Sequence, residues 1–203
     1  VDILVGTQMV TKGHDLPHVT LVGVISADAA LSIPDFRASE RTFQLLVQVA
    51  GRAGRGETPG RVLVQTYAPE HHAIRFALRP DVLGFLEHEL RDRRELGYPP
   101  FSRVVLVRVD ALDEKEAERG AAELAGAARG VARQAVGSAD ALYVLGPTAA
   151  PIAKVRNRYR FRVMLRTASR ESVRRGALAV HAAIPRLPRA VRVAIDVDPV
   201  GLL

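Results

Sequence analysis

Two arginines three residues apart, Arg52 and Arg55, are the residues of this sequence with the clearest potential for chemistry. They follow Gln48 and Gly51 in the run 48–55, where a predicted helix enters a Gly-rich turn. The planar guanidinium group donates two parallel hydrogen bonds to a phosphate and can stabilise charge that develops on a transferred phosphoryl group. A solvated helix end with two surface arginines is the alternative, and this string alone leaves both interpretations open.

A second polar loop, residues 6–17, follows an apolar run near the N-terminus. Such a loop can present Thr7 and backbone amides to a nucleic-acid phosphate, Lys12 as a point charge, and Asp15 as an acceptor for a sugar hydroxyl. The alternative is an ordinary turn in which Gly13 supplies the required backbone angles. The two loops together, in this order, favour the ligand-binding interpretation.

A third group is a row of arginines at every second position: Arg156, Arg158, Arg160 and Arg162. Side chains of a strand alternate between its faces, so the four share one face if a strand extends through all of them. The residues between them, Tyr159, Phe161 and Val163, then face the core. Because Glu171 is the only acid in residues 154–175, we expect a face that binds phosphates of branched or single-stranded DNA; a merely solvated basic face is the alternative.

The elements that position the first two loops have α/β character. Residues 2–5 and 19–26 are predicted to be buried parallel strands, residues 38–51 a helix and residues 61–66 another strand. Loops at the strand ends of such sheets are where ligands bind. From residue 69 to 96 the pattern is that of an exposed connecting helix, which the pair Pro99-Pro100 ends. We therefore place a domain boundary at that pair.

Residues 101–203 are predicted to fold in the order β-α-β-β-α-β. The strands are expected at residues 102–109, 141–145, 158–167 and 191–197, and the helices at about residues 114–135 and 170–184. The residues between 145 and 158 are predicted to form a loop that contains Gly146 and Pro147. This order is the split β-α-β arrangement of ferredoxin-like domains, which host many functions.

The charge is distributed unevenly between the two halves of the sequence. The net charge of the whole is +7, with a balance of −1 over residues 1–100 and of +8 over residues 101–203. The basic half suggests a polyanion as partner, with a solvated basic face as the alternative. Cysteine is absent, which excludes a disulfide framework and a thiolate metal site within this sequence. No long apolar run or signal-peptide pattern is present, so we expect no membrane partner and a cytoplasmic location.

The residues above also carry a resemblance to a known family. Residues 6–22 and 48–55 resemble motifs V and VI of superfamily 2 helicases, and together with Asp35-Phe36-Arg37 and Lys12-Gly13-His14 they resemble the primosomal replication-restart helicases. The resemblance continues through Gln65-Thr66-Tyr67, Tyr98-Pro99-Pro100-Phe101 and the closing Asp196-Val197-Asp198-Pro199. It covers nearly the whole sequence, which opens without Met inside an apolar run and is expected to be a C-terminal fragment of a larger protein.

The resemblance implies a fold, a set of domains and an activity. Residues 1–78 would be the C-terminal part of a RecA-like second helicase lobe, residues 79–100 a helical linker, and residues 101–203 a basic DNA-binding domain. The implied activity is ATP-dependent 3′-to-5′ translocation and unwinding at stalled or branched forks, leading to primosome assembly and replication restart. Implied partners are branched and single-stranded DNA, primosome proteins, single-stranded-DNA-binding protein and the replicative helicase loader, in the cytoplasm with the nucleoid.

The resemblance also assigns roles to residues. Arg55 resembles the arginine finger, with Arg52 and Gln48 as companions in catalysis. The nucleotide-contacting positions are Gly13, Asp15 and Gly51, and the DNA-contacting positions in motif V are Thr7, Gln8 and Lys12. The P-loop and the acids that hold Mg²⁺ with ATP belong to a first lobe, so this sequence alone is expected to be inactive. The family's zinc region lies upstream as well, and we predict no metal ligand in this sequence.

Two other classes of function compete with the helicase interpretation. The first is a non-catalytic protein with an inactive motor that recognises forks and recruits the primosome. The second is an RNA-binding ferredoxin-like protein, which is weakened because residues 102–109 and 158–167 show no exposed aromatic pair for stacking on bases. His71, His72 and His88 are predicted to be surface helix residues, because no acid or further histidine stands at metal spacing around them. Asp196 and Asp198 are expected to form a cap or ion pairs with arginines.

Overall fold

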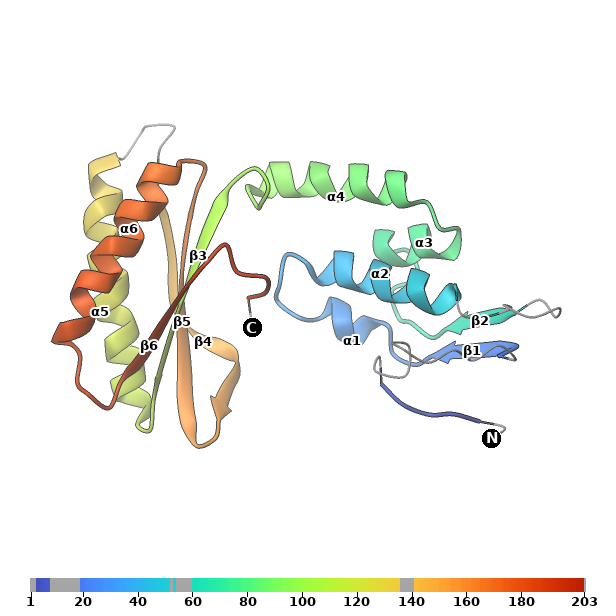
Figure 1. The fold of residues 1–203 in the computed structure, drawn as a ribbon, viewed down its shortest axis with the longest axis horizontal. Coiled ribbons are helices and arrows are strands. Elements are labelled where there is room, and N and C mark those ends of the chain that lie inside the picture. The colour runs from blue at the N-terminus through green and yellow to red at the C-terminus, as the bar shows by residue number, and fades with distance from the viewer. Residues whose placement is uncertain (1–2, 8–18, 52, 54–59, 136–140, 203) are drawn as a thin grey trace. The chain divides into compact units, whose positions relative to one another are not determined.

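The computed structural model describes residues 3–7, 19–51, 53, 60–135 and 141–202. The chain divides into two compact units, residues 1–91 and residues 92–203, and each is described by itself. The chain has a mixed α/β fold with a parallel sheet in the first unit and an antiparallel sheet in the second (Figure 1). The predicted domain limits at residues 78 and 100 stay predictions. In the described part of the chain, no helix is both long enough and apolar enough to cross a membrane.

The first unit is built on two short parallel strands, β1 (Leu21–Val24) and β2 (Arg61–Val64). Between them the chain forms α1 (Asp28–Leu31) and α2 (Ala38–Ala50), and after them α3 (His72–Leu78) and α4 (Val82–Leu96). The strands predicted at residues 19–26 and 61–66 and the helix at residues 38–51 are therefore confirmed as elements. The burial predicted for the first of these strands is wrong, since Leu21 of β1 is 57% exposed. A helix that crosses between two parallel strands is the expected wiring of an α/β fold.

Two further expectations for the first unit are wrong. Residues 3–7 carry no strand, and Ile3 and Val5 are 80% and 87% exposed; an apolar run becomes a buried strand only where a neighbouring strand pairs with it. The pattern over residues 69–96 forms two helices instead of one, because the chain turns at Arg79 (φ −132°) before Pro80. Helix α4 is more than a connector, since Phe85 is 1% exposed and stacks on Phe43 of α2 with ring centroids 4.1 Å apart.

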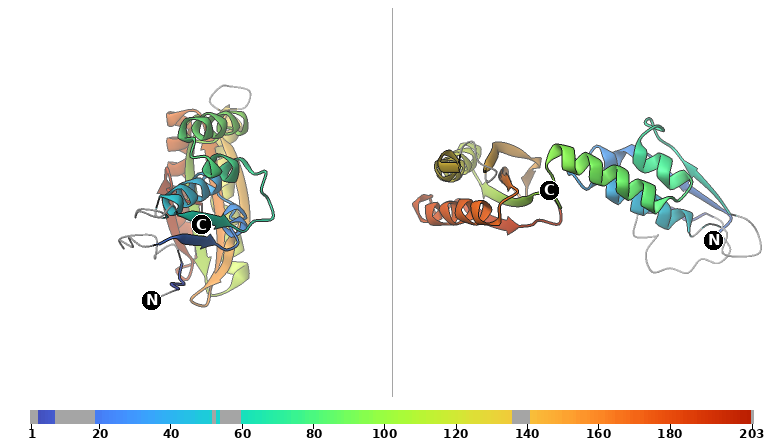
Figure 2. Two further views of the ribbon diagram at one scale, coloured as in Figure 1. Left: turned by 90° about the vertical axis from the view of Figure 1, so that its right-hand side faces the viewer. Right: turned by 90° about the horizontal axis from the view of Figure 1, so that it is seen from above.

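The second unit has the predicted order β-α-β-β-α-β. Its strands are β3 (Arg103–Ala111), β4 (Tyr143–Val155), β5 (Arg158–Thr167) and β6 (Arg192–Val197), and its helices are α5 (Glu114–Ala132) and α6 (Arg170–Ala183). Short 3-10 turns, Arg133–Ala135 and Ile184–Arg186, extend the helices. The sheet order is β4-β5-β3-β6, with antiparallel pairs throughout. Both helices cover one face of the sheet (Figures 1 and 2).

The core of the second unit lies between the sheet and the two helices. Its strand contribution alternates along β3 and β5, with Val105, Val107 and Val163 at most 1% exposed. The helices contribute the other side, where α5 places Leu124 and α6 places Val180, both fully buried. Asp113 and Ser169 begin the helices by accepting hydrogen bonds from the backbone amides of Glu116 (2.9 Å) and Ser172 (3.3 Å).

Strand β4 is much longer than predicted, because the expected Gly-Pro loop lies inside it. The pairing of β4 with β5 shifts register between Leu145 and Thr148 and again between Ala149 and Lys154. Gly146 has φ +94°, and a Cβ atom there would lie 2.7 Å from the carbonyl oxygen of Arg162. Proline is tolerated here because β4 is an edge strand, where a missing amide or a bulge disrupts only one ladder.

Candidate nucleic-acid interface

Of the predicted motor residues, the structure describes three. Gln48 and Gly51 stand at the C-terminal end of α2, where the amide of Gly51 donates to the carbonyl of Val47 (3.0 Å). Thr7 is exposed. The other predicted catalytic, nucleotide-binding and motif V residues lie outside the described residues: Gln8, Lys12, Gly13, Asp15, Arg52 and Arg55. The structure confirms the predicted helix, which ends at Ala50. The roles of all nine predicted motor residues stay predictions.

The run Gln65-Thr66-Tyr67 joins the end of β2 to the end of β1. The side-chain oxygen of Gln65 accepts a hydrogen bond from the amide of Ser26 (2.6 Å), and Thr66 donates to Asp28 (2.7 Å). The amide of Tyr67 also donates to Asp28 (2.9 Å). The Thr66 hydroxyl, followed by this amide, lowers the pKa of the Asp28 carboxyl below its ordinary 3.8. These residues hold the strand ends in place.

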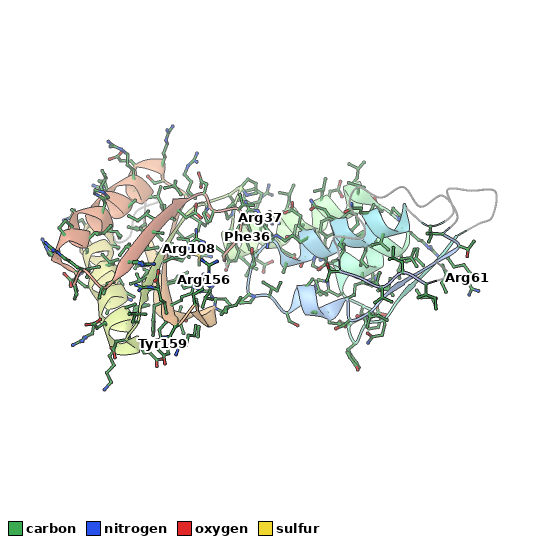
Figure 3. All side chains as sticks on the ribbon, turned by 60° about the horizontal axis from the view of Figure 1, so that its bottom comes forward. Phe36, Arg37, Arg61, Arg108, Arg156 and Tyr159 are labelled. Carbon is green, nitrogen blue, oxygen red and sulfur yellow. The ribbon has the colours of Figure 1, made fainter. Side chains whose placement is uncertain are left out.

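The run Asp35-Phe36-Arg37 forms the turn that begins α2. The buried carboxylate of Asp35 accepts a hydrogen bond from the amide of Arg37 (2.9 Å) and pairs with Arg41 of α2 (3.0 Å). The guanidinium carbon of Arg37 lies 4.4 Å from the ring centroid of Phe36 (Figure 3). A carboxylate at the first turn of a helix is stabilising, because it faces unpaired amides and the positive end of the helix dipole. The run Asp35-Phe36-Arg37 therefore has a structural role at the start of α2, the helix whose last turn contains Gln48.

A large group of arginines in the second unit lies on the sheet face opposite the helices. Phe161, Val163 and Leu165 of β5 pack in the core, so the residues that alternate with them point to the other face. The registers of β3 and β6 add further arginines to that face. We call this surface the arginine face; over β3, β5 and β6 it holds Arg108, Arg158, Arg160, Arg162, Arg166 and Arg192 together with Asp110 and Asp196. These side chains give it a net charge of +4.

Several of these arginines are held by groups of the protein itself. Arg158, whose side chain is only 15% exposed, pairs with the carboxylate of Asp110 and donates to the carbonyl of Ala190 (2.8 Å). Arg108 pairs with Asp196 at 2.7 Å (Figure 3). The Nη1 of Arg162 donates to the carbonyl of Leu202 (2.8 Å), which ties the C-terminal residues to this face. Such contacts orient the guanidinium groups and reduce their mutual repulsion.

Two arginines of the arginine face differ from these. Arg160 and Arg192 stand directly across from Asp110 on its two sides, in the ladders to β5 and β6. Within the described part of the chain, neither guanidinium group forms a hydrogen bond or an ion pair, and the carboxylate between them is occupied by Arg158. An external anion can therefore approach these two arginines of the arginine face without displacing a protein contact.

Arg156 does not share the strand with the other arginines of its row, because β5 begins at Arg158. With Asn157 it forms the two-residue turn between β4 and β5, and both have positive φ, 48° and 61°, as the type I′ hairpin turn requires. Tyr159 is also not a core residue; the Nζ of Lys154 lies 4.4 Å from its ring centroid. Figure 3 shows Arg156 and Tyr159 at this hairpin. The prediction that Arg156 shares a strand face with the other three arginines is therefore wrong.

The reasoning about the histidines is wrong, whereas that about the last aspartates is confirmed. The ring of His72 lies 4.5 Å from those of His71 and His88, between centroids, and its Nε2 is 3.2 Å from the carboxylate of buried Glu89. An acid and two histidines therefore do surround it. The sequence pattern missed this because α3 folds back on α4. Asp196 and Asp198 form ion pairs with arginines of β3 as expected, the second with Arg103 at 3.7 Å.

Comparison with known proteins identifies the family of the chain. The family model described as "Primosomal protein N C-terminal domain" matches residues 94–200. Three relatives are named "Replication restart protein PriA": that of Bacillus subtilis is 47% identical over 81% of this chain, that of Treponema pallidum 40% over 100%, and that of Synechocystis 39% over 99%. The chain spans 20% to 30% of the length of these relatives. The chain therefore belongs to the replication restart protein PriA family and carries its primosomal protein N C-terminal domain.

Proposed function

We propose that this chain acts in replication restart, as part of an ATP-dependent 3′-to-5′ DNA helicase or translocase that recognises branched forks. The observation that carries the proposal is the arginine face, with six arginines and two aspartates over β3, β5 and β6. Relatives named for replication restart, which match nearly the whole chain, support the same conclusion.

A face of this kind favours the phosphate backbone over base edges. Guanidinium groups release counterions when they neutralise phosphates, so binding is strong at low salt and weakens steeply as salt rises. The backbone carries no sequence information directly. Arg160 and Arg192 are the proposed phosphate contacts. The other arginines of the face, Arg108, Arg158 and Arg162, add to its positive electrostatic potential and are fixed in position by protein groups. Selectivity among DNAs then comes from shape, which suits a protein that must act at any fork.

The motor assignments belong to the same proposal. Arg55 would reach the γ-phosphate of ATP as the arginine finger, with Arg52 and Gln48 beside it. The α2 helix that leads into this motif and the parallel β1–β2 pair support a RecA-like second lobe. The β4-β5-β3-β6 sheet order supports a ferredoxin-like domain in the second unit. Mg²⁺ and the P-loop would come from a first lobe, so the chain by itself should not hydrolyse ATP.

The remaining implications concern location and partners. A role at replication forks places the protein in the cytoplasm with the nucleoid. The protein partners would be primosome proteins, single-stranded-DNA-binding protein and the loader of the replicative helicase. The alternative of an inactive motor that only marks forks differs in one measurable respect: assembled with its first lobe, it would bind forks without hydrolysing ATP.

The test is binding of a fluorescently labelled forked DNA by the 203-residue chain, measured by anisotropy at several salt concentrations. The proposal expects the logarithm of the binding constant to fall linearly with the logarithm of salt, at about 0.9 per phosphate contacted for a duplex. Binding that is absent at low salt, or that does not change with salt, contradicts it. An unrelated polyanion, heparin, should compete, because the recognition is mainly electrostatic.

A further inference from the structure

Three side chains meet at the end of the sheet where β4 begins. Arg166 of β5 lies directly across from Tyr143 of β4 in the ladder, so both belong to the face opposite the helices. The guanidinium carbon of Arg166 is 5.7 Å from the ring centroid of Tyr143 and 5.2 Å from that of Tyr98. Both distances are within the range of cation–π attraction. The cation is thus flanked by two aromatic rings.

The position of Arg166 is fixed by the backbone. Its Nη1 donates a hydrogen bond to the carbonyl of Leu96 (2.7 Å). That carbonyl is held because α4 closes at Gly97, whose φ is +65°, and the amide of Tyr98 donates to the carbonyl of Arg93 (2.7 Å). The arrangement therefore exists before any ligand arrives, and a ligand would not need to order it.

One ring of this group is open to a partner. Tyr143 is 57% exposed, and Leu145, two residues further on the same face of β4, is 41% exposed. Aromatic rings have a large area to bury and a face that stacks on other π systems. Here that ring stands on the same sheet face as Arg160 and Arg162, whose charge attracts a polyanion. Charge and aromaticity together suit a nucleotide, which offers both a phosphate and a flat base.

The geometry points to a stacking site at Tyr143 for an unpaired base of a single-stranded DNA arm, with Arg166 as the neighbouring cation. A base inside a duplex is already covered on both faces, whereas a single strand leaves base faces free for aromatic side chains. This inference rests on the proposed function and deepens it. Along β5, six residues separate Arg160 from Arg166, which corresponds to ~20 Å. One strand could therefore contact phosphate-binding arginines and stack on Tyr143.

The test uses the full chain and a fork whose single-stranded arm carries 5-iododeoxyuridine at successive positions. This base photocross-links to an aromatic ring on which it stacks, and the attached peptide is identified by mass spectrometry. Affinity for the unmodified single strand, the fork and a blunt duplex is measured at the same time. The variants are Tyr143→Ser, Tyr143→Phe, which keeps the ring, and Tyr67→Ser, a matched control because Tyr67 is 89% exposed in the other unit.

The inference expects a cross-link at residue 143 that is lost in Tyr143→Ser and kept in the other two variants. Loss of one stacked base should weaken single-strand binding about 5- to 150-fold, with little change in the salt slope because the phosphate contacts remain. Wild-type cross-linking elsewhere, or unchanged single-strand affinity in Tyr143→Ser, overturns the stacking site while the salt-dependent binding of the fork still stands. An equal loss for the blunt duplex also overturns it, by showing stacking on a terminal base pair. Absence of salt-dependent binding to any DNA overturns both this inference and the function on which it rests.

Discussion

Replacing Arg160 and Arg192 together by glutamine should reduce the salt dependence of DNA binding and leave the fold intact. Both side chains flank Asp110 and form no ion pair within the described residues. If each contacts one phosphate, the salt slope for a duplex falls by about 0.9 per residue, or about 1.8 for the pair. Between about 50 and 200 mM salt, a fourfold change, the double variant should then lose about 12-fold less affinity than the parent.

The assay is fork binding by anisotropy at five or more salt concentrations, with thermal unfolding to confirm that the variant is folded. The matched control is Arg174→Gln with Arg175→Gln, which removes the same charge from the exposed side of α6, on the other face of the sheet. The control pair should lower affinity slightly and keep the slope. If the α6 pair removes the slope and the Arg160 and Arg192 pair does not, the helix side binds DNA and the assignment of the arginine face is refuted.

Four further substitutions test the structure of the second unit and of the first. Gly146→Ala should destabilise the second unit by about 1–3 kcal/mol, because alanine is strained at φ +94° and its Cβ would lie 2.7 Å from a carbonyl oxygen of β5. Gly126→Ala, with open space around its new methyl group, should stabilise the unit by about 0.5–1 kcal/mol. Urea unfolding measures both. Asp110→Asn should lower stability by about 1–3 kcal/mol, because Arg158 loses its charged partner, and yet raise fork affinity at low salt; equal or lower affinity would contradict the electrostatic argument. His71 accepts the amide hydrogen bond that begins α3, and burial, followed by the nearby charge of His72, lowers its pKa below 6.5. Because the unfolded chain takes up the proton first, the free energy of unfolding falls as the pH drops below about 6.5. His71→Ser, which keeps a capping oxygen, should flatten that dependence in thermal melts between pH 7 and 5.

The alternation along β5 could be predicted from the sequence because it is a local property. A strand places every second side chain on one face whatever its neighbours do, and Phe161 and Val163 identified the buried side. The order of the elements in the second unit was predictable from similar local patterns. Residue 156 was misplaced because nothing in the arginine spacing marks where the strand stops; the turn is defined by positive φ at Arg156 and Asn157.

What could not be predicted depends on register between strands. Arg192 faces Asp110 across the β3–β6 ladder and Arg160 faces it across the β3–β5 ladder, and no spacing in the sequence contains either pairing. Tyr143 was overlooked for a similar reason. Residues 102–109 and 158–167 contain no exposed aromatic pair, whereas the exposed ring comes from β4 and its neighbour Tyr98 from the segment after α4. The sequence predicted a loop at Gly146, where the strand in fact continues, so it did not predict the long edge strand β4.

The distinction between held and available arginines changes how the arginine face must be tested. Replacing the row Arg158, Arg160 and Arg162 together looks like the obvious experiment from the sequence. Arg158 and Arg162, however, donate to Ala190 and Leu202, and Arg158 pairs with Asp110, so their loss removes these contacts and weakens the fold itself. A triple variant that binds DNA poorly would therefore not separate unfolding from a lost phosphate contact. Arg160 and Arg192 avoid this ambiguity, because their removal takes charge from the surface and leaves every observed protein contact of the face in place.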